Sequence, residues 1–538
     1  MEDGKEYTDI IGGHGRFQIA VLVFCFFGAV AHCVQDFTII FFAPNVDHWC
    51  ARPKEVLQSN ISVEEWKNFS LPVVKSRSGV DEYSRCAVYN ISIKNGSLHR
   101  QDNADIIQCT SWEYDLSFYK NTIVNEWDLV CDREWLVSMS KTVYMLSYFL
   151  SSLINGQLSD RFGRRKVLIF CLSWFLAFVF LTLLSTNIAM FMVFRFLSTF
   201  GITSVFVNST VILAELVSAK YRVIYCLTYK YGWSLGYLLL PLIAWLVPNW
   251  FWLHFVVSFP CILLLSVLWI VPETPRWLLI KRKFPELEKL LLYGAKKNGK
   301  DLKQAKNQIE DYIAYHSQKI VKEEKATVLD LLRPAVRKNT FILYFSWFIN
   351  SYIYYALSWN TNDLGGDPYW NFFLCGAVEL PEVVLCIFLG KFFGNRRCLF
   401  FFQVMAGICL IAMALTPPDI VWLTIVVSMS GKFFSSGVFG LSFVYTPEIF
   451  PTVMRNAALG SASACARVGA LLSPFIHQMA DVTYAWVPIA IPGALCICSG
   501  LLVLLLPEMK DKALQDTLQE RVELRTQEIP NYRSGIKL

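Results

Sequence analysis

The chain has 538 residues, of which 54% are hydrophobic and only 17% are charged, and its mean hydropathy is +0.41. A water-soluble domain needs more charge on its surface, so this composition excludes an ordinary soluble protein. The net charge of +6 does not indicate nucleic-acid binding, because Lys and Arg concentrate in short segments beside apolar runs, the pattern that orients a membrane protein.

Twelve apolar segments are each expected to form a membrane-spanning helix, which takes roughly 20 residues. In chain order they are 17–42, 137–158, 167–185, 188–214, 223–247, 250–271, 340–360, 371–390, 399–416, 420–446, 456–480 and 484–506. The first 15 residues lack the basic start and the cleavage site of a signal peptide, so we expect the first helix to be retained. The sequence therefore predicts an all-α polytopic membrane protein.

The basic residues assign a side to each loop. Four of them follow the second helix, and many more lie in the segment 272–339, so the positive-inside rule places both regions and both termini in the cytoplasm. The expected organisation is a cytoplasmic N-terminus, a first six-helix half, a cytoplasmic linker that contains helices, a second half and a cytoplasmic tail, with boundaries at 1–16, 17–271, 272–339, 340–506 and 507–538.

The loop 43–136 then faces the outside. It contains four glycosylation sequons, at Asn60, Asn68, Asn90 and Asn95. It also contains four cysteines, Cys50, Cys86, Cys109 and Cys131, for which an oxidising compartment predicts two disulfides with three possible connectivities.

The two halves read as diverged repeats. Glu215 precedes Arg222 by seven residues after the fourth helix, and Glu448 precedes Arg455 by seven after the tenth. Gly163-Arg-Arg-Lys follows the second helix, and Gly394-Asn-Arg-Arg follows the eighth. Two parallel six-helix halves are the architecture of an alternating-access carrier, with a binding site between them.

Several motifs resemble known transporters. The segment Gly156-Gln-Leu-Ser-Asp-Arg-Phe-Gly-Arg-Arg165 is similar to the helix 2–3 signature of the major facilitator superfamily. The large sequon-bearing loop and the segments 125–132, 272–278, 431–433, 445–452 and 455–456 resemble the organic cation, carnitine and organic anion transporter family. This resemblance implies uptake of small organic ions at the plasma membrane. The chain departs from the family pattern at Lys391-Phe392, where Asp-Arg is usual, and at Met509, where Thr is usual.

Charged residues at the cytoplasmic helix ends are candidate gate residues. Ion pairs there can hold the inner side closed and must break when it opens; the alternative is a role in topology and fold stability alone. The candidates are Asp160, Arg161, Arg164, Glu215, Arg222, Glu448 and Arg455.

Charges inside the helices are the main candidates for substrate binding, because an unpaired charge there costs about 3 kcal/mol on insertion scales. By resemblance, Glu379 matches the helix 8 acid of the cation and carnitine branches, and Arg467 matches a helix 11 position that is basic in the anion and carnitine branches. Both signs together suit a zwitterion, with its ammonium near Glu379 and its carboxylate near Arg467. The alternative is that these two residues pair with each other.

Five further charges lie within the helices. Lys230 stands where the cation branch has Gln, which argues against a pure cation carrier, and Asp36 offsets Lys230 or binds an ammonium. Glu382 lies nearly one turn beyond Glu379 and faces the same cavity or a neighbouring helix. Arg195 and Lys432 are structural or coupling residues, or binding residues.

Aromatic residues are dense in the seventh helix, and aromatic faces attract quaternary ammonium groups by about 0.5–2 kcal/mol each. Tyr352, Tyr355 and Trp359 have a spacing that predicts a shared face, and Tyr237 in the fifth helix is a further candidate. For any single aromatic residue, ordinary packing in the membrane is the alternative.

The sequence indicates no enzyme, no cofactor, no metal site and no phosphate-binding loop, so transport must draw on gradients. We expect a monomeric plasma-membrane carrier of small organic cations or carnitine-like zwitterions, in contact with the lipid bilayer and with a co-transported ion as a further candidate partner. Two alternatives remain: an organic anion transporter or exchanger, and a non-transporting membrane glycoprotein whose outer loop serves adhesion or reception.

Overall fold

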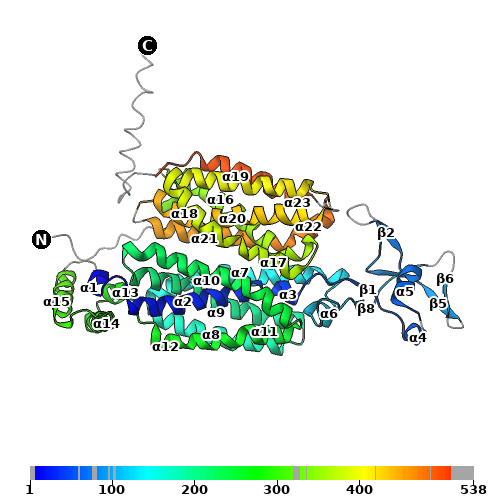
Figure 1. Cartoon of the computed structure of the whole chain (residues 1–538), viewed down its shortest axis with the longest axis horizontal. Helices are drawn as coiled ribbons and strands as arrows, with labels where there is room; N and C mark the ends of the chain where they lie inside the picture. The colour runs from blue at the N-terminus through cyan, green and yellow to red at the C-terminus, as the bar shows by residue number, and fades with distance from the viewer. Residues whose placement is uncertain are drawn as a thin grey trace, which may run out of the picture.

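The computed structural model describes residues 7–58, 61–75, 81–94, 97–100, 105–318, 327–334, 336–417, 420–451, 454–484 and 486–509. Its first half contains short α1 (Tyr7–Ile10) and then α2 (Arg16–Phe37), α3 (Ile39–Phe42), α7 (Trp135–Phe162), α8 (Arg164–Leu181), η2 (Thr182–Leu184), α9 (Ile188–Leu216), α10 (Ala219–Leu246), α11 (Trp250–Ser258), η3 (Phe259–Ser266) and α12 (Val267–Ile270). Long helices run side by side through this half (Figure 1).

The second half repeats this plan. Its helices are α16 (Arg337–Trp359), η5 (Thr361–Leu364), α17 (Pro368–Ala377), α18 (Glu379–Phe393), α19 (Asn395–Leu415), α20 (Val421–Ile449), α21 (Arg455–Leu472), η7 (Ser473–Phe475), α22 (Ile476–Val482) and α23 (Val487–Val503). The chain segment that links the halves contains α13 (Pro275–Ile280), α14 (Phe284–Lys297), α15 (Leu302–Gln318) and η4 (Val328–Leu332).

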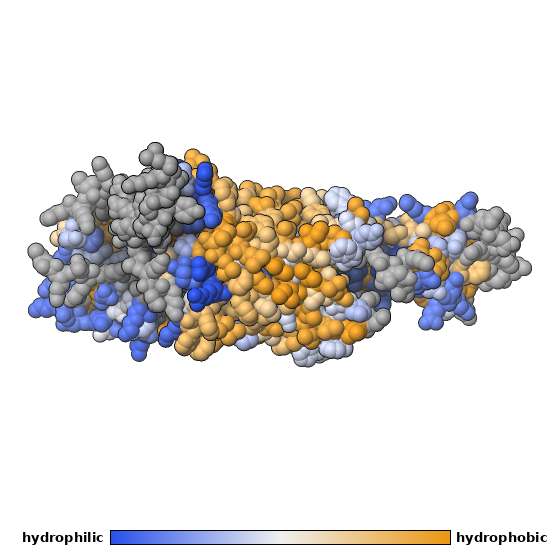
Figure 2. Space-filling view, turned by 90° about the horizontal axis from the view of Figure 1, so that it is seen from above, coloured by the Kyte–Doolittle hydropathy of each residue, from blue (hydrophilic) through white to orange (hydrophobic). Residues whose placement is uncertain are grey.

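Seven of the described helical segments are long and apolar enough to cross a membrane: 16–42, 164–184, 188–216, 250–270, 368–393, 395–415 and 421–449. The other expected spans are helical as well, as α7, α10, α16, α21 and the shorter apolar α23. Hydrophobic residues cover the middle of the visible face, and hydrophilic residues gather toward its two ends (Figure 2). The fold is therefore an all-α membrane bundle.

Three expected helices are interrupted where the chain contains proline. The eighth divides at Val378, three residues before Pro381, and the sixth changes to a 3₁₀ helix around Pro260. The eleventh breaks at η7, which contains Pro474. Proline lacks the amide hydrogen of the helical ladder and its ring clashes with the carbonyl four residues earlier, so these breaks follow from local chemistry.

The loop 43–136 forms a small unit at one end of the bundle (Figure 1), and Ile123, Val124 and Trp127 anchor it in the bundle core. Its short strands pair antiparallel as β1 (His48–Cys50) with β8 (Trp112–Tyr114), β2 (Val73–Lys75) with β3 (Asp81–Tyr83), β4 (Ala87–Tyr89) with β7 (Ile106–Gln108), and β5 (Ile91–Lys94) with β6 (Ser97–Arg100). The unit also holds α4 (Lys54–Leu57), α5 (Val63–Ser70), α6 (Ile123–Glu126) and η1 (Cys131–Arg133).

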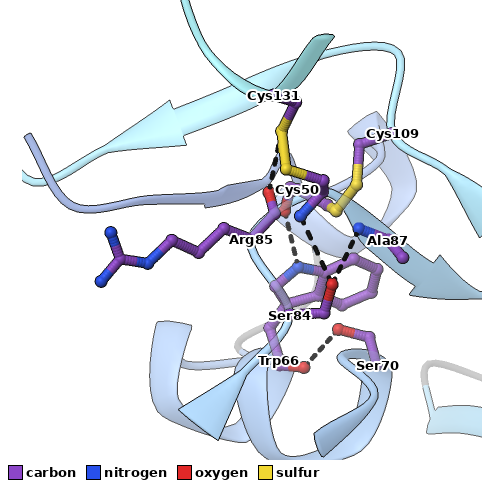
Figure 3. Close-up of a disulfide and its surroundings, with 9 residues drawn as sticks. Cys50, Trp66, Ser70, Ser84, Arg85, Ala87, Cys109 and Cys131 are labelled. Atoms are coloured by element: carbon purple, nitrogen blue, oxygen red, sulfur yellow. Dashed lines mark hydrogen bonds between the residues drawn. A yellow bond between two sulfur atoms is a disulfide. The ribbon is translucent and has the colours of Figure 1, made fainter. Parts of the chain in front are cut away.

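Two disulfides select one of the three possible connectivities, Cys50 with Cys109 and Cys86 with Cys131. The indole of Trp66 donates to the Cys50 carbonyl at 3.0 Å and packs beneath the first disulfide (Figure 3). With so small an apolar core, covalent cross-links contribute much of the stability of such a unit.

We call the end of the bundle that carries this loop the outer end, and the end that carries α13–α15 the inner end (Figure 1). Of the four sequons, Asn68 and Asn90 lie in the described part of the loop, whereas Asn60 and Asn95 lie outside the described residues.

All four sequon asparagines are expected to carry glycans in expressing cells. Enzymatic deglycosylation should increase the gel mobility of the protein, and successive Asn→Gln changes at the four sites should do so stepwise. As a matched control, Asn45→Gln changes an asparagine of the same loop that has no sequon and should leave the mobility unchanged. A wild-type band that deglycosylation does not shift would show that the loop does not reach the glycosylating compartment.

Candidate functional site

Seven charged residues form a cluster in the interior of the bundle, and we refer to them as the charged cluster. They are Asp36 on α2, Arg195 on α9, Lys230 on α10, Glu379 and Glu382 on α18, Lys432 on α20 and Arg467 on α21. The helices of both halves contribute, so the cluster lies at the junction between them.

Lys432 and Glu379 form its most deeply buried ion pair, with 3.1 Å between Nζ and Oε1 and 1% exposure of each side chain. Lys432 also donates to the hydroxyls of Ser358 at 2.6 Å and Tyr237 at 3.2 Å. Its ammonium lies 3.0 Å from the ring centroid of Tyr354, whose hydroxyl donates to Glu379 at 2.8 Å. Both charges are thus compensated by hydrogen bonds as well as by each other, as burial at this depth requires.

Lys230 and Glu382 form a second ion pair, and this one directly joins the two halves. The distance between Nζ and Oε2 is 2.9 Å, and the Ser436 hydroxyl donates to the same oxygen at 3.0 Å. Glu382 is fully buried, whereas the Lys230 side chain is 29% exposed. The pair is therefore reachable by solvent from the lysine side, which distinguishes it from the sealed Lys432–Glu379 pair.

Arg467 has a different environment. Its guanidinium donates to the hydroxyls of Tyr148 at 3.0 Å and Tyr355 at 3.1 Å, and it stacks 3.8 Å from the centroid of the Tyr148 ring. Among the described residues no carboxylate lies within ion-pair distance of this guanidinium, and Nε has no hydrogen-bond partner. A half-buried guanidinium with an unused donor is suited to bind a carboxylate from outside the protein.

Asp36 lies on the other side of the Tyr355 hydroxyl, which donates to its Oδ2 at 3.5 Å. The carboxylate is fully buried. Arg195 is anchored beside it, since it donates to the Gln35 carbonyl at 3.0 Å and to the Thr38 hydroxyl at 3.3 Å. Tyr355 therefore links the positive Arg467 to the negative Asp36.

Aromatic rings line this part of the junction. Phe37 packs 4.3 Å from Tyr237 between ring centroids, and Tyr237 stacks on Phe372 at 5.0 Å. Tyr355 lies 5.1 Å from Trp359. These rings come from α2, α10, α16 and α17, so both halves contribute to the aromatic wall.

The structure decides against two of the alternatives left open by the sequence and corrects one expectation. Glu379 does not pair with Arg467, because it forms its ion pair with Lys432. Lys230 is offset by Glu382 rather than by Asp36. Tyr352 does not share a face with Tyr355 and Trp359: it packs with α19 and α23, next to Leu410, while the other two face the junction. Tyr352 lies about 60° from Tyr355 around the helix axis and about 10 Å from Trp359 along it, so it contacts different neighbours from either ring.

The predicted gate residues of the first half lie at the inner end. Arg164 pairs with Asp160 at 2.7 Å and with Glu215 at 3.5 Å. Arg161 contacts the ring of Phe162, and the side chain of Arg222 lies outside the described residues. Each of these described ion pairs joins two residues of the same half, so in this conformation they do not bridge the halves.

The second half uses different side chains at the equivalent positions. Asn395, rather than an arginine, donates to both carboxylate oxygens of Glu448 at 2.9 Å. Arg455 donates to the Phe450 carbonyl at 3.2 Å. Lys391 is exposed. At this position the second half therefore has an Asn–Glu hydrogen bond where the first half has an Arg–Glu ion pair.

A carboxylate above a glycine turn is a repeated feature that sequence reasoning missed. Glu273 accepts from the backbone amides of Arg164 at 2.8 Å and Arg165 at 3.3 Å, and Glu508 pairs with Arg396 at 3.3 Å. Gly163 and Gly394 precede these sites with φ of 106° and 86°, and in each case a Cβ would collide with the carboxylate. Burial raises the pKa of Glu273. The repeated Pro-Glu sequence at 272–273 and 507–508 is the pattern from which this feature could have been predicted.

Besides those within the charged cluster, described hydrogen bonds between the halves lie at the outer end. Ser138 donates to Gln478 at 3.1 Å, Thr142 donates to the Leu471 carbonyl at 3.1 Å, and Asn362 donates to the Ile40 carbonyl at 3.0 Å. The described pairs at the inner end stay within one half. The halves are thus held together on the outer side of the charged cluster.

Comparisons with known proteins agree with this architecture. The family described as "Sugar (and other) transporter" matches residues 92–519. The chain is 34% identical to the organic cation transporter protein of Drosophila melanogaster, covering 96% of this chain and 94% of that protein. It is 31% identical to human organic cation/carnitine transporter 2 (98% and 95% covered) and 30% identical to rabbit organic anion transporter 3 (96% and 93% covered).

A solved structure with a similar fold is the inward open form of the xylose transporter XylE from E. coli. It has a TM-score of 0.60 at 16% identity and covers 95% of this chain and all of that one. The chain is therefore a membrane transporter of the major facilitator superfamily and not an enzyme. Within that superfamily it belongs to the organic cation, carnitine and organic anion transporter family.

The Lys432–Glu379 pair generates a prediction about stability. Lys432→Gln or Glu379→Gln alone strands a buried charge, which costs about 3–5 kcal/mol, so each variant should reach the cell surface poorly. The double variant removes both charges and should recover most of the surface protein, measured by surface biotinylation. Lys391→Gln, at an exposed lysine, is the control. If both single variants matched wild type, the pair would not be a sealed structural contact.

The inner-end residues generate a prediction about turnover. Asp160→Asn or Arg164→Ala should lower the maximal uptake rate by about tenfold, which is about 1.4 kcal/mol in the barrier, while changing substrate affinity less, because these residues stabilise a conformation. Lys391→Ala should do much less. Uptake kinetics normalised to surface protein measure both effects. A silent Asp160→Asn together with an inactive Lys391→Ala would contradict the gate assignment.

Proposed function

We propose that this transporter carries small carnitine-like zwitterions or organic cations across the plasma membrane by alternating access, with the inner end and both termini in the cytoplasm. The observation that carries the proposal is Arg467, a half-buried guanidinium with no described carboxylate within ion-pair distance and an unused Nε donor. Organic cation/carnitine transporter 2 is among the relatives, and the carnitine in its name is a zwitterion of this kind.

The balance of charge supports a substrate that carries a carboxylate. The charged cluster contains four cations, Arg195, Lys230, Lys432 and Arg467, and three carboxylates, Asp36, Glu379 and Glu382. Two cations are paired directly, which leaves two arginines for one aspartate. A substrate carboxylate at Arg467 would compensate the excess charge.

The cationic pole of the substrate would face the aromatic wall. Tyr237, Tyr355 and Trp359 belong to this wall, and Glu379 lies behind it, where it accepts from the hydroxyl of Tyr354, a ring neighbour of Tyr355. A quaternary ammonium gains from such rings without needing a direct ion pair. Glu379 would act through the field it contributes while it remains bonded to Lys432.

The same excess of cations favours a second candidate, an organic anion. One relative is an organic anion transporter, and Lys230 adds a partly exposed cation at the junction. The two candidates differ in what the aromatic wall does: it binds the ammonium pole of a zwitterion, whereas an anion would use only the basic residues.

Substrate selection by Arg467 can be tested directly. Arg467→Gln removes charge-assisted hydrogen bonds worth about 1.5–3 kcal/mol, so carnitine uptake efficiency should fall by about 10- to 100-fold, while tetramethylammonium uptake should change little. The double variant Glu379→Gln/Lys432→Gln should weaken both substrates, since it removes the carboxylate behind the wall without stranding a charge.

The measurement is uptake of carnitine, tetramethylammonium and benzoate, normalised to surface protein, with Lys391→Gln as the control. Equal losses for all three substrates in Arg467→Gln would remove the recognition role and leave a structural one. Wild-type uptake of benzoate alone would favour the organic anion function instead.

A further inference from the structure

A pocket of about 420 Å³ lies at the inner end of the first half, where three separate segments of the chain meet. Its wall contains Gly12 and Gly13 from the N-terminal segment, Ser218 and Lys220 from the start of α10, and Lys300 from the turn between α14 and α15. Figure 1 shows α1 and α15 together at this end. None of these residues belongs to the charged cluster or to the predicted gate residues, so the pocket is separate from the sites described above.

Ser218 occupies the N-cap position of α10, a helix of 28 residues, but its side chain caps none of the helix amides. It is only 8% exposed, and among the described residues its hydroxyl has no hydrogen-bond partner. Buried polar groups are nearly always bonded, so this hydroxyl in the pocket wall indicates a partner from outside the chain. The first amides of a helix lack carbonyl partners and carry a partial positive charge, which makes this end of α10 suited to an anion.

Two lysines add full positive charges to the pocket. Lys220 and Lys300 are both exposed, and among the described residues neither ammonium forms an ion pair. Asp9 is the carboxylate of the pocket wall, and two lysines against one aspartate leave a net charge of +1. The start of α10 increases this positive potential. The ligand that fits the pocket is therefore an anion.

The backbone of the N-terminal segment holds the two sides of the pocket together. Gly12 and Gly13 have φ of 96° and 57°, in the left-handed region that favours glycine. A Cβ at Gly12 would lie 2.7 Å from Cε of Lys300, and one at Gly13 would lie 2.8 Å from Oγ of Ser218. The Ser218 amide also donates to the Gly13 carbonyl at 3.3 Å. The lysine and the serine are thus both packed against one glycine turn, which fixes their positions relative to each other.

We propose that this pocket binds the phosphate of an anionic phospholipid headgroup. Lys220 and Ile224 are four residues apart and lie on the same face of α10, and Ile224 is 59% exposed. A headgroup at Lys220 therefore leaves its acyl chains beside an apolar, exposed part of the helix, which a soluble anion would not use. Basic pockets at the ends of membrane helices bind phospholipid headgroups by the same combination. The inference does not depend on the substrate proposed above.

A bound headgroup would stabilise the turn between α9 and α10. Glu215, which pairs with Arg164, lies three residues before Ser218, and its carbonyl accepts from the hydroxyl of Tyr7 at 2.7 Å. One phosphate in contact with the serine and both pocket lysines would link α10, the N-terminal segment and the linker helices beside this ion pair. The lipid should therefore stabilise the folded protein, because it binds only where all three segments are assembled.

The test uses the purified full-length protein in detergent micelles, with a fluorescent phosphatidylinositol 4-phosphate as the probe. Wild type should bind the probe saturably, and the unlabelled lipid should raise the melting temperature. Lys220→Gln/Lys300→Gln should weaken the affinity by about 30-fold, since each lysine beside a headgroup contributes about fivefold. Ser218→Ala should weaken it by about fivefold, through the loss of one hydrogen bond.

The matched control is Lys296→Gln/Lys303→Gln, which removes two exposed lysines of α14 and α15 outside the pocket and should bind as wild type. Equal losses in the two double variants would reduce the binding to general charge attraction and overturn the site. Competition by phosphatidylcholine at the same concentration would also overturn it, and equally effective inorganic phosphate would assign the pocket to a soluble anion instead. If the Lys220→Gln/Lys300→Gln variant does not fold, an unchanged affinity in Ser218→Ala would contradict the proposal.

Discussion

The need to compensate charge in a low-dielectric interior determines how the two halves of this transporter meet. A lone charge in a membrane helix is costly, and the chain meets that cost by placing each buried acid next to a basic residue or a hydroxyl. The Lys230–Glu382 pair crosses the junction directly, and Lys432–Glu379 reaches across it through the Tyr237 hydroxyl. The halves therefore share electrostatic contacts rather than only an apolar surface.

This arrangement also explains why the cluster can move. An ion pair such as Lys230–Glu382, with a partly exposed lysine, can exchange its partner for water as the halves separate. The Lys432–Glu379 pair is different, because both residues belong to the second half and remain together in any relative position of the halves. The Lys230–Glu382 pair can thus break when the halves separate, while the Lys432–Glu379 pair holds α18 and α20 together.

The sequence predicted the bundle, its helix positions and the class of transporter because each depends on local pattern: apolar length, basic loops and motif residues. It did not predict which charges pair, since the interior helices carry four cations as possible partners of Glu379 and spacing along the chain does not rank them. Tyr354 and Tyr148 were also missed as site residues, because their importance comes from Lys432 and Arg467, which lie far away in sequence. The three helix breaks coincide with prolines, although prolines also lie inside the continuous helices α10, α20 and α23.

The segment that links the two halves along the chain packs mostly against the first half. Helices α13 and α14 and the described part of α15 bury Leu278, Leu287 and Ile309 in the core of the first half, together with Ile11 from the N-terminus. After α15 ends at Gln318, η4 places Leu331 in the core of the second half. The N-terminal segment and α13–α15 therefore belong to the packed core of the first half, and any movement of that half relative to the other carries them with it.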